Sequence, residues 1–88
     1  MKVNFSKFET FTSIRKDSVL VMDIKESLAD TLYQRCAGIK AAALAMKIYN
    51  SSDEIELNDD EITIIDNVMI QSTGLMNDSW NRLKMQKT

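Results

Sequence analysis

The sequence predicts an α+β fold in which an N-terminal β-hairpin packs on a bundle of three or four helices. Apolar residues alternate with polar ones near the N-terminus, which is typical of strands, and recur every three or four positions later, which is typical of helices. The 88 residues contain two glycines and no proline, which favours helices joined by short loops. At this length, residues 1–88 are expected to form one small domain around a single core.

The N-terminal quarter of the chain is expected to form the hairpin. Val3 and Phe5 alternate with polar neighbours, and residues 8–14 continue the alternation on the opposite parity, which indicates a bulge or a bend between the two runs. Residues 15–18 are a polar turn, and residues 19–22 are a short β-prone run. Since two strands alone are barely stable in water, one face should lie on the helices. An exposed edge would be open to pairing with another chain.

The first helix is expected to begin at Asp23, because Asp23 and Glu26 have the spacing of a capping box. Residues at i, i+4 steps form its apolar stripe, which Ala29 and Tyr33 flank, and Gly38 ends or bends the helix. The stripe consists of Ile24, Leu28, Leu32 and Cys36. A cysteine on such a stripe is expected to be a buried, inert thiol.

The second helix is expected from about Ile39 to Tyr49, a segment rich in alanine, which is the best helix former. One side of this helix should face the core, and Leu44 and Ile48 widen its apolar stripe. The predicted buried side comprises Ile39, Ala42, Ala43, Met46 and Tyr49. The apolar run in this helix is too short to span a bilayer, so core packing explains it.

Four local signals predict that a third helix starts at Asn58. Asn58 is a good N-cap residue, and Glu61 stands where it completes a capping box. Leu57 and Ile62 occupy the two positions of a hydrophobic staple. The acidic residues at 59–61 place negative charge at the positive end of the helix dipole.

The apolar spacing of the third helix continues across Ser72, Thr73 and Gly74. Its members are Ile62, Ile65, Met69, Ser72, Met76, Trp80 and Leu83. Either one helix continues to about Lys84, or the chain breaks near Gly74 into two helices. We favour the break or a kink, because Ser, Thr and Gly together weaken this turn. Trp80 is expected to lie in the core.

The net charge of −2 hides an uneven distribution. Residues 1–47 carry eight Lys or Arg against five Asp or Glu, whereas residues 48–81 carry eight acids and no Lys or Arg. One interpretation is that the acids crowd a loop and a helix start, as helix dipoles favour. The functional interpretation is a negative face for a basic partner protein. The candidate partner-binding residues are Asp53, Glu54, Glu56, Asp59 and Asp60.

The sequence offers few groups for catalysis or metal binding. It has no histidine, one cysteine, no phosphate-binding glycine loop and no nucleophile elbow. The acids of residues 53–61 lack the central glycine of a calcium loop. We therefore predict no catalytic residue, no cofactor and no metal. Nucleic-acid binding is disfavoured by a pI near 5.0 and scattered basic residues. With no signal peptide and no membrane span in the sequence, a cytoplasmic location is expected.

Residues 23–61 resemble small proteins encoded in bacteriophage and prophage gene clusters. The similarity lies in Ser-Leu-Ala-Asp at 27–30 with Leu-Tyr at 32–33, in residues 44–49, and in Ile-Glu-Leu at 55–57 leading into Glu61. Most such proteins have no assigned function, so the resemblance implies a phage-derived accessory protein and transfers no site residue.

We therefore expect a non-enzymatic module that binds another protein, either as an assembly factor for phage particles or as an inhibitor of a host defence protein. The alternative is a small nucleic-acid-binding regulator, and an enzyme is a third option. A homo-oligomer, most simply a dimer, is also expected, because so short a chain has broad apolar helices and several methionines to bury.

Overall fold

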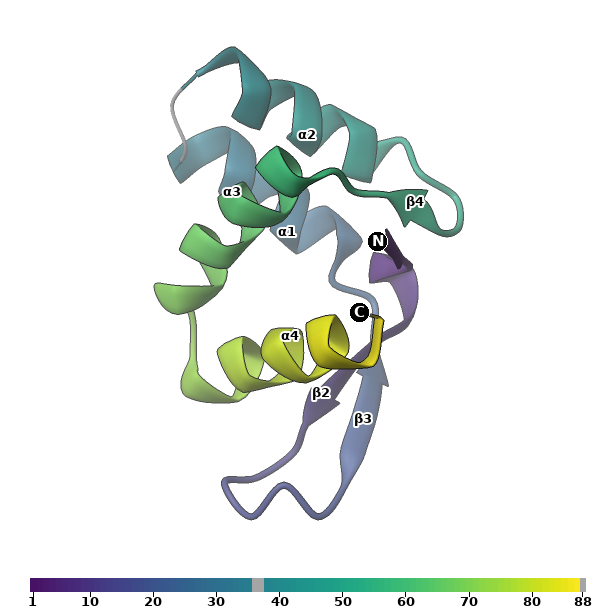
Figure 1. The fold of residues 1–88 in the computed structure, drawn as a ribbon, viewed down its shortest axis with the longest axis vertical. Helices are drawn as coiled ribbons and strands as arrows, with labels where there is room; N and C mark the ends of the chain where they lie inside the picture. Colours follow the sequence, from purple (N-terminus) through teal and green to yellow (C-terminus); the bar gives the residue numbers. More distant parts are fainter. Residues whose placement is uncertain (36–37, 88) are drawn as a thin grey trace.

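The α+β prediction is confirmed by a computed structural model, which describes residues 1–35 and 38–87 (Figure 1). An N-terminal hairpin lies below a group of four helices, and a second pair of short strands joins the N-terminus to the middle of the chain. In chain order the elements are β1 (Lys2–Val3), the 3₁₀ turn η1 (Phe5–Lys7), β2 (Phe8–Phe11), β3 (Val19–Met22), α1 (Lys25–Arg35), α2 (Ile39–Tyr49), β4 (Ile55–Glu56), α3 (Asp59–Ile70) and α4 (Gly74–Lys87).

The hairpin pairs β2 with β3 in antiparallel register, from Phe8 opposite Met22 to Phe11 opposite Val19. The bend predicted from the change of parity before residue 8 is confirmed. Residues 5–7 form the turn η1 there, and the Asn4 side chain caps this turn. The loop is longer than the predicted turn at residues 15–18, since the strands end at residues 11 and 19. A residue predicted to continue the strand, Ile14, instead lies in this loop with 88% of its surface exposed.

The second strand pair was not predicted. β1 pairs antiparallel with β4, with Lys2 opposite Glu56 and Val3 opposite Ile55. The Leu57 amide adds a hydrogen bond of 2.7 Å to the Met1 carbonyl oxygen. This pairing fixes the N-terminus beside the start of α3, although more than fifty residues separate the two strands in the sequence.

α1 begins at Lys25, slightly later than the predicted capping box would place it. Asp23 Oδ1 accepts a hydrogen bond of 3.1 Å from the Lys25 amide, and the Leu28 amide donates to the Ile24 carbonyl oxygen, 2.8 Å away. The side chains of Ile24, Leu28 and Leu32 are buried as predicted, whereas Tyr33 is exposed. The prediction for Cys36 lies outside the described residues.

α2 has the predicted bounds, but the face predicted to be buried is wrong. The buried residues are Ala41, Leu44, Ala45 and Ile48. Ile39, by contrast, is 89% exposed, and Met46 and Tyr49 are about half exposed. α2 is apolar around most of its circumference, so periodicity alone does not determine which face meets α1 and α3.

The capping box at the start of α3 is confirmed, and so is the break before α4. The Glu61 amide donates to Asn58 Oδ1, and the Asn58 amide donates to Glu61 Oε1, each at 2.9 Å. α3 ends at Ile70, and α4 begins after Thr73, whose hydroxyl accepts from the Met76 amide at 3.2 Å. The break allows α4 to turn and pack across β2 (Figure 1).

The core lies where the helices meet β1, η1 and β2. Trp80 is fully buried, as predicted, and its ring stacks on Phe5 with centroids 6.2 Å apart. The Phe5 and Phe8 rings are also 6.2 Å apart. Around them pack the buried aliphatic side chains Val3, Leu28, Leu32, Leu44, Ile48, Leu57, Ile65 and Met69. One cluster thus joins elements from both ends of the chain.

Candidate functional site

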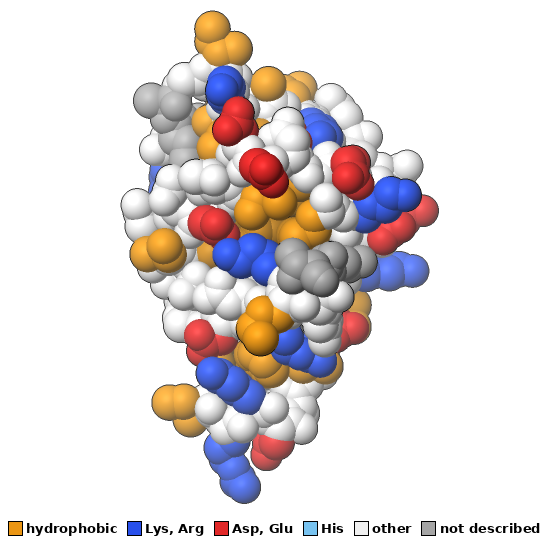
Figure 2. All heavy atoms as spheres, viewed as in Figure 1, with side chains coloured by type: hydrophobic (Ala, Val, Ile, Leu, Met, Phe, Trp, Pro, Cys, Tyr) orange, Lys and Arg blue, Asp and Glu red, His pale blue; other side chains and the backbone are white. Residues whose placement is uncertain are grey.

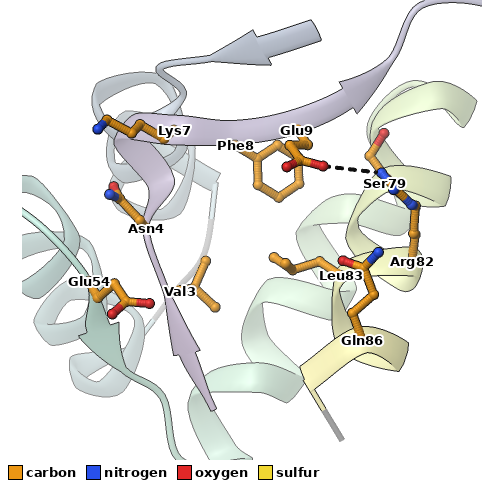
Figure 3. A pocket seen from close by; sticks show the side chains of 10 residues that line it. All are labelled: Val3, Asn4, Lys7, Phe8, Glu9, Glu54, Ser79, Arg82, Leu83 and Gln86. Carbon is orange, nitrogen blue, oxygen red and sulfur yellow. Dashed lines mark hydrogen bonds and ion pairs between the residues drawn. The ribbon is translucent and has the colours of Figure 1, made fainter. Parts of the chain in front are cut away.

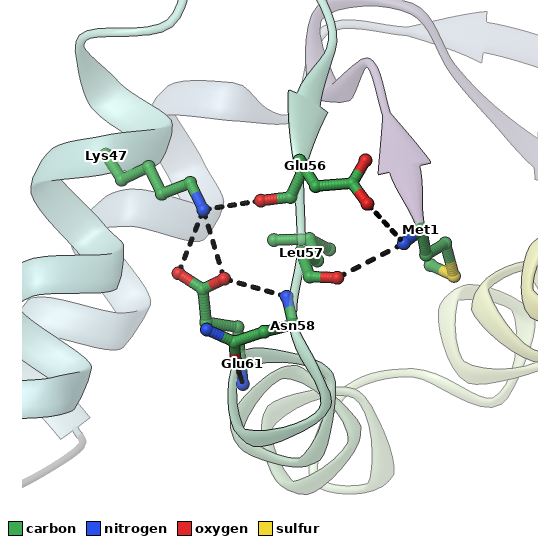
Figure 4. Close-up of polar contacts among 6 residues, drawn as sticks. All are labelled: Met1, Lys47, Glu56, Leu57, Asn58 and Glu61. Atoms are coloured by element: carbon green, nitrogen blue, oxygen red, sulfur yellow. Dashed lines mark hydrogen bonds and ion pairs between the residues drawn. The ribbon is translucent and has the colours of Figure 1, made fainter.

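The acidic segment, residues 53–61, contains the predicted partner-binding residues. It spans β4, the following loop and the first turn of α3. Glu56 Oε1 lies 3.2 Å from the Met1 ammonium nitrogen, which also donates to the Leu57 carbonyl oxygen (Figure 4). Asp53 Oδ1 accepts from the Asn4 side-chain amide at 3.2 Å. Asp60 lies 3.2 Å from Lys40 Nζ on α2.

Lys47 connects α2 to the start of α3. Its Nζ lies 3.0 and 3.1 Å from the two carboxylate oxygens of Glu61 and also donates to the Glu56 carbonyl oxygen (Figure 4). Glu61 therefore serves the capping box and an ion pair together. Asp59 differs from these acids, because its carboxylate contacts no hydrogen-bond donor or cation among the described residues.

The fold thus brings cations of residues 1–47 to the acids of residues 48–81. A further pair of this kind joins Lys16 to Asp78 at 3.2 Å. Lys84, near the C-terminus, lies 2.7 Å from Asp66. On the face shown in Figure 2, basic and acidic side chains are interspersed and form no surface of a single sign. Such exposed pairs each contribute about 0–1 kcal/mol, so their main consequence is a reduced negative field around the acidic segment.

A pocket of about 240 Å³ lies between β1, β2 and α4 (Figure 3). Val3, Phe8 and Leu83 form its apolar wall, and Glu54 lies at the side opposite α4. Arg82 on α4 lies 3.4 Å from Glu9 at the rim of this pocket. Ser79, which also lines this pocket, accepts a hydrogen bond from the Phe11 amide and donates one to the Leu75 carbonyl oxygen.

The α1–α2 groove is the open hollow between the outer faces of the two helices, with a volume of about 320 Å³. Buried Ala29 and Ala45 line it, so the two backbones approach closely there. Tyr33, Met46 and Tyr49 stand around it with 66%, 50% and 51% of their surfaces exposed. The apolar spacing placed Met46 and Tyr49 on the buried side of the second helix and Tyr33 beside the stripe of the first, so the sequence did not indicate this surface.

Two carboxylates complete the α1–α2 groove. Glu26 and Asp30 lie one helical turn apart on α1, both exposed, and neither carboxylate contacts a described hydrogen-bond donor or cation. Like charges at this spacing destabilise an isolated helix by a few tenths of a kcal/mol. The groove therefore combines exposed aromatic and thioether groups with negative charge that the described part of the fold does not neutralise.

Among residues 1–35 and 38–87, no group of three or more His, Cys, Asp or Glu side chains is placed to hold a metal ion. Of the helices described, none is both long and apolar enough to cross a membrane.

Comparisons with protein-family models, with curated proteins and with solved structures found no match to this chain.

Proposed function

We propose that this chain is a non-enzymatic protein-binding module whose α1–α2 groove binds a basic amphipathic helix of a partner protein. The observation that supports this most directly is the grouping of Tyr33, Met46 and Tyr49 around a floor of alanines, beside the unpaired carboxylates of Glu26 and Asp30.

The apolar part of the groove suits a helical partner. Tyrosine and methionine are enriched at protein interfaces, because each offers a large contact area and adapts to the surface that it meets. The alanine floor leaves room for one or two large side chains, and an amphipathic helix presents such anchors at intervals of three or four residues.

The charged part of the groove favours a basic partner. A Lys or Arg near Glu26 and Asp30 would relieve the repulsion between these two carboxylates and would form charge-assisted hydrogen bonds. Complementary charge of this kind mainly raises the association rate and the specificity. The acidic segment lies elsewhere on the surface, and residues 53, 54, 56, 59 and 60 are a second proposed contact area for the same basic partner.

The resemblance to phage-encoded proteins supports a phage-derived accessory role, either in particle assembly or as an inhibitor of a host defence protein. The alternative function is a small nucleic-acid-binding regulator. Its support is weaker, because many of the basic side chains in the described residues pair with acids of the same chain.

A binding titration tests the proposal. The probe is a fluorescent Lys/Leu amphipathic helical peptide, and its anisotropy is followed as the protein is added. Each lost charged contact is worth about 0.2–1 kcal/mol, so the double change Glu26→Gln with Asp30→Asn should weaken binding by about 2- to 30-fold. Tyr33→Ser should weaken it by about tenfold, as for an aromatic interface anchor.

Asp17→Asn is the control, because Asp17 is an exposed carboxylate on the hairpin loop, outside both the groove and the acidic segment. This variant should bind as the wild type does. No saturable binding, or equal weakening by all the variants, would contradict the proposal. Salt-sensitive binding to duplex DNA or to RNA in a gel-shift titration would instead support the nucleic-acid alternative.

A further inference from the structure

The two edges of the β2–β3 hairpin differ in what covers them. On the β2 edge, α4 lies across the strand, and the Phe11 amide donates to Ser79 Oγ at 2.9 Å. Ser79 is itself buried and donates to the Leu75 carbonyl oxygen at 2.6 Å. Among the strands of residues 1–35 and 38–87, β3 pairs with β2 alone, and in Figure 1 the hairpin extends beyond α4 into open space. The β3 edge is therefore the open edge.

The ladder determines which backbone groups this open edge presents. The Thr12 amide donates to the Ser18 carbonyl oxygen at 3.3 Å, so residues 12 and 18 form a hydrogen-bonded pair. Hydrogen-bonded and non-hydrogen-bonded pairs alternate in an antiparallel ladder. Leu20 and Met22 therefore direct their amides and carbonyls toward β2, and Val19 and Val21 direct theirs outward. The outward Phe11 amide on β2, opposite Val19, agrees with this alternation.

The side chains of β3 leave this edge unprotected. All four are apolar, and 41–56% of the surface of each residue is exposed. Natural edge strands usually carry a charge, a proline or a bulge that blocks pairing with another chain. β3 has no charged residue and no proline over residues 18–22.

We propose that β3 pairs antiparallel with β3 of a second copy of this chain, which converts two hairpins into one four-stranded sheet. A strand that is open, uncharged and apolar matches best another strand with the same properties, and a two-fold dimer is self-complementary. A hairpin gains stability when further strands extend it, because two strands alone are marginal in water.

The alternation also restricts the register of the pair. Outward residues must face outward residues, so the two-fold axis passes through a residue and not between two residues. With the axis at Leu20, Val19 lies opposite Val21 of the partner subunit. All hydrogen bonds between the two chains are then made by backbone groups of the two β3 strands. With the axis at Val21, some of the bonds would require Asp23, which follows the strand. We assign the axis to Leu20.

A proline substitution separates edge pairing from hairpin stability. Val21→Pro removes an amide that points outward, so the β2–β3 ladder remains while pairing with a second chain is blocked. Val21→Thr keeps the amide and the β-branched shape and is the matched control. Light scattering at micromolar concentration should give twice the 10.0 kDa chain mass for the wild type and Val21→Thr, and the single mass for Val21→Pro. A monomeric wild type, or loss of the dimer in both variants or in neither, would overturn the proposal.

Disulfide trapping tests the register independently of that variant. In a chain with Cys36→Ser, Leu20→Cys should cross-link two copies on oxidation, because non-hydrogen-bonded neighbours bring their Cβ atoms within about 4.5–5.5 Å. Ile14→Cys, on the exposed loop of the same hairpin, is the control and should remain uncross-linked. Equal cross-linking at the two positions would overturn the pairing. No residue of β3 lines the α1–α2 groove. Val21→Pro should therefore leave peptide binding unchanged, and the dimer and the groove are tested independently.

Discussion

The indole N–H of Trp80 donates a hydrogen bond to Asp66 Oδ1 across 2.6 Å, and this bond joins α4 to α3 beyond the break between them. Lys84 Nζ lies 2.7 Å from the same oxygen. Trp80 is fully buried, so Asp66 satisfies a donor that would otherwise have no partner in the core. The position of α4, and with it the cover over the β2 edge, therefore depends in part on one carboxylate.

Asp66→Ala should lower the free energy of unfolding by about 1–3 kcal/mol, which is the usual cost of leaving a buried donor unsatisfied. Asp66→Asn retains an acceptor oxygen and should cost less. Urea unfolding of the two variants and the wild type measures the difference. Equal losses for Ala and Asn would mean that the hydrogen bond to Trp80 contributes little.

Asn58→Ala should lower the free energy of unfolding by about 1 kcal/mol, because it removes one half of the capping box. Asn67→Ala is the control, since Asn67 is exposed within α3 and alanine favours a helix. The urea midpoint should fall for the first variant and stay the same or rise slightly for the second. An unchanged midpoint for Asn58→Ala would contradict the role of the cap.

A pair of substitutions tests the corrected buried face of α2. Ile48→Ala should cost about 2–5 kcal/mol, because Ile48 is fully buried and the change leaves a cavity. Ile39→Ala should change stability by less than about 0.5 kcal/mol, because Ile39 is mostly exposed. Thermal or urea unfolding compares the two variants. If Ile39→Ala lowered the free energy of unfolding more than Ile48→Ala, the buried face would be the one predicted from the sequence.

Neutralising the acidic segment should slow the association of a basic peptide and leave its dissociation rate nearly unchanged. The variant combines Asp53→Asn, Glu54→Gln and Glu56→Gln. Exposed charges guide a partner over about 8–10 Å at physiological ionic strength, so the effect should fade as salt rises. Stopped-flow fluorescence gives both rates. If the association rates of wild type and variant are equal at low salt, the segment serves folding alone.

Local signals made the start of α3 and the break before α4 predictable from the sequence. The cap at Asn58 depends on residues within four positions of it, and the Ser72–Gly74 break depends on three adjacent residues. By contrast, the β1–β4 pair depends on contacts across more than fifty residues, which no local pattern encodes. The change in the alternation of apolar residues before residue 8 predicted the bend at η1, but it did not indicate that β1 pairs with β4.

The candidate surfaces were less predictable for a physical reason. α2 carries more apolar residues than one face can bury, so Met46 and Tyr49 had the same spacing as core residues. The acidic segment stood out in the sequence, yet its neighbours Lys40, Lys47 and the Met1 ammonium group come from distant positions. Charge along a sequence therefore overstated the charge on the folded surface.

The methionine methyl groups provide the most direct test of binding at the α1–α2 groove. Met46 lies in the groove, Met22 lies on β3, and Met85 lies on α4, which lines neither surface. With ¹³C-methyl methionine, a titration with the basic helical peptide should shift the Met46 signal and leave the Met22 and Met85 signals in place. Binding that leaves Met46 unshifted, or that shifts Met85 as much as Met46, would contradict the account.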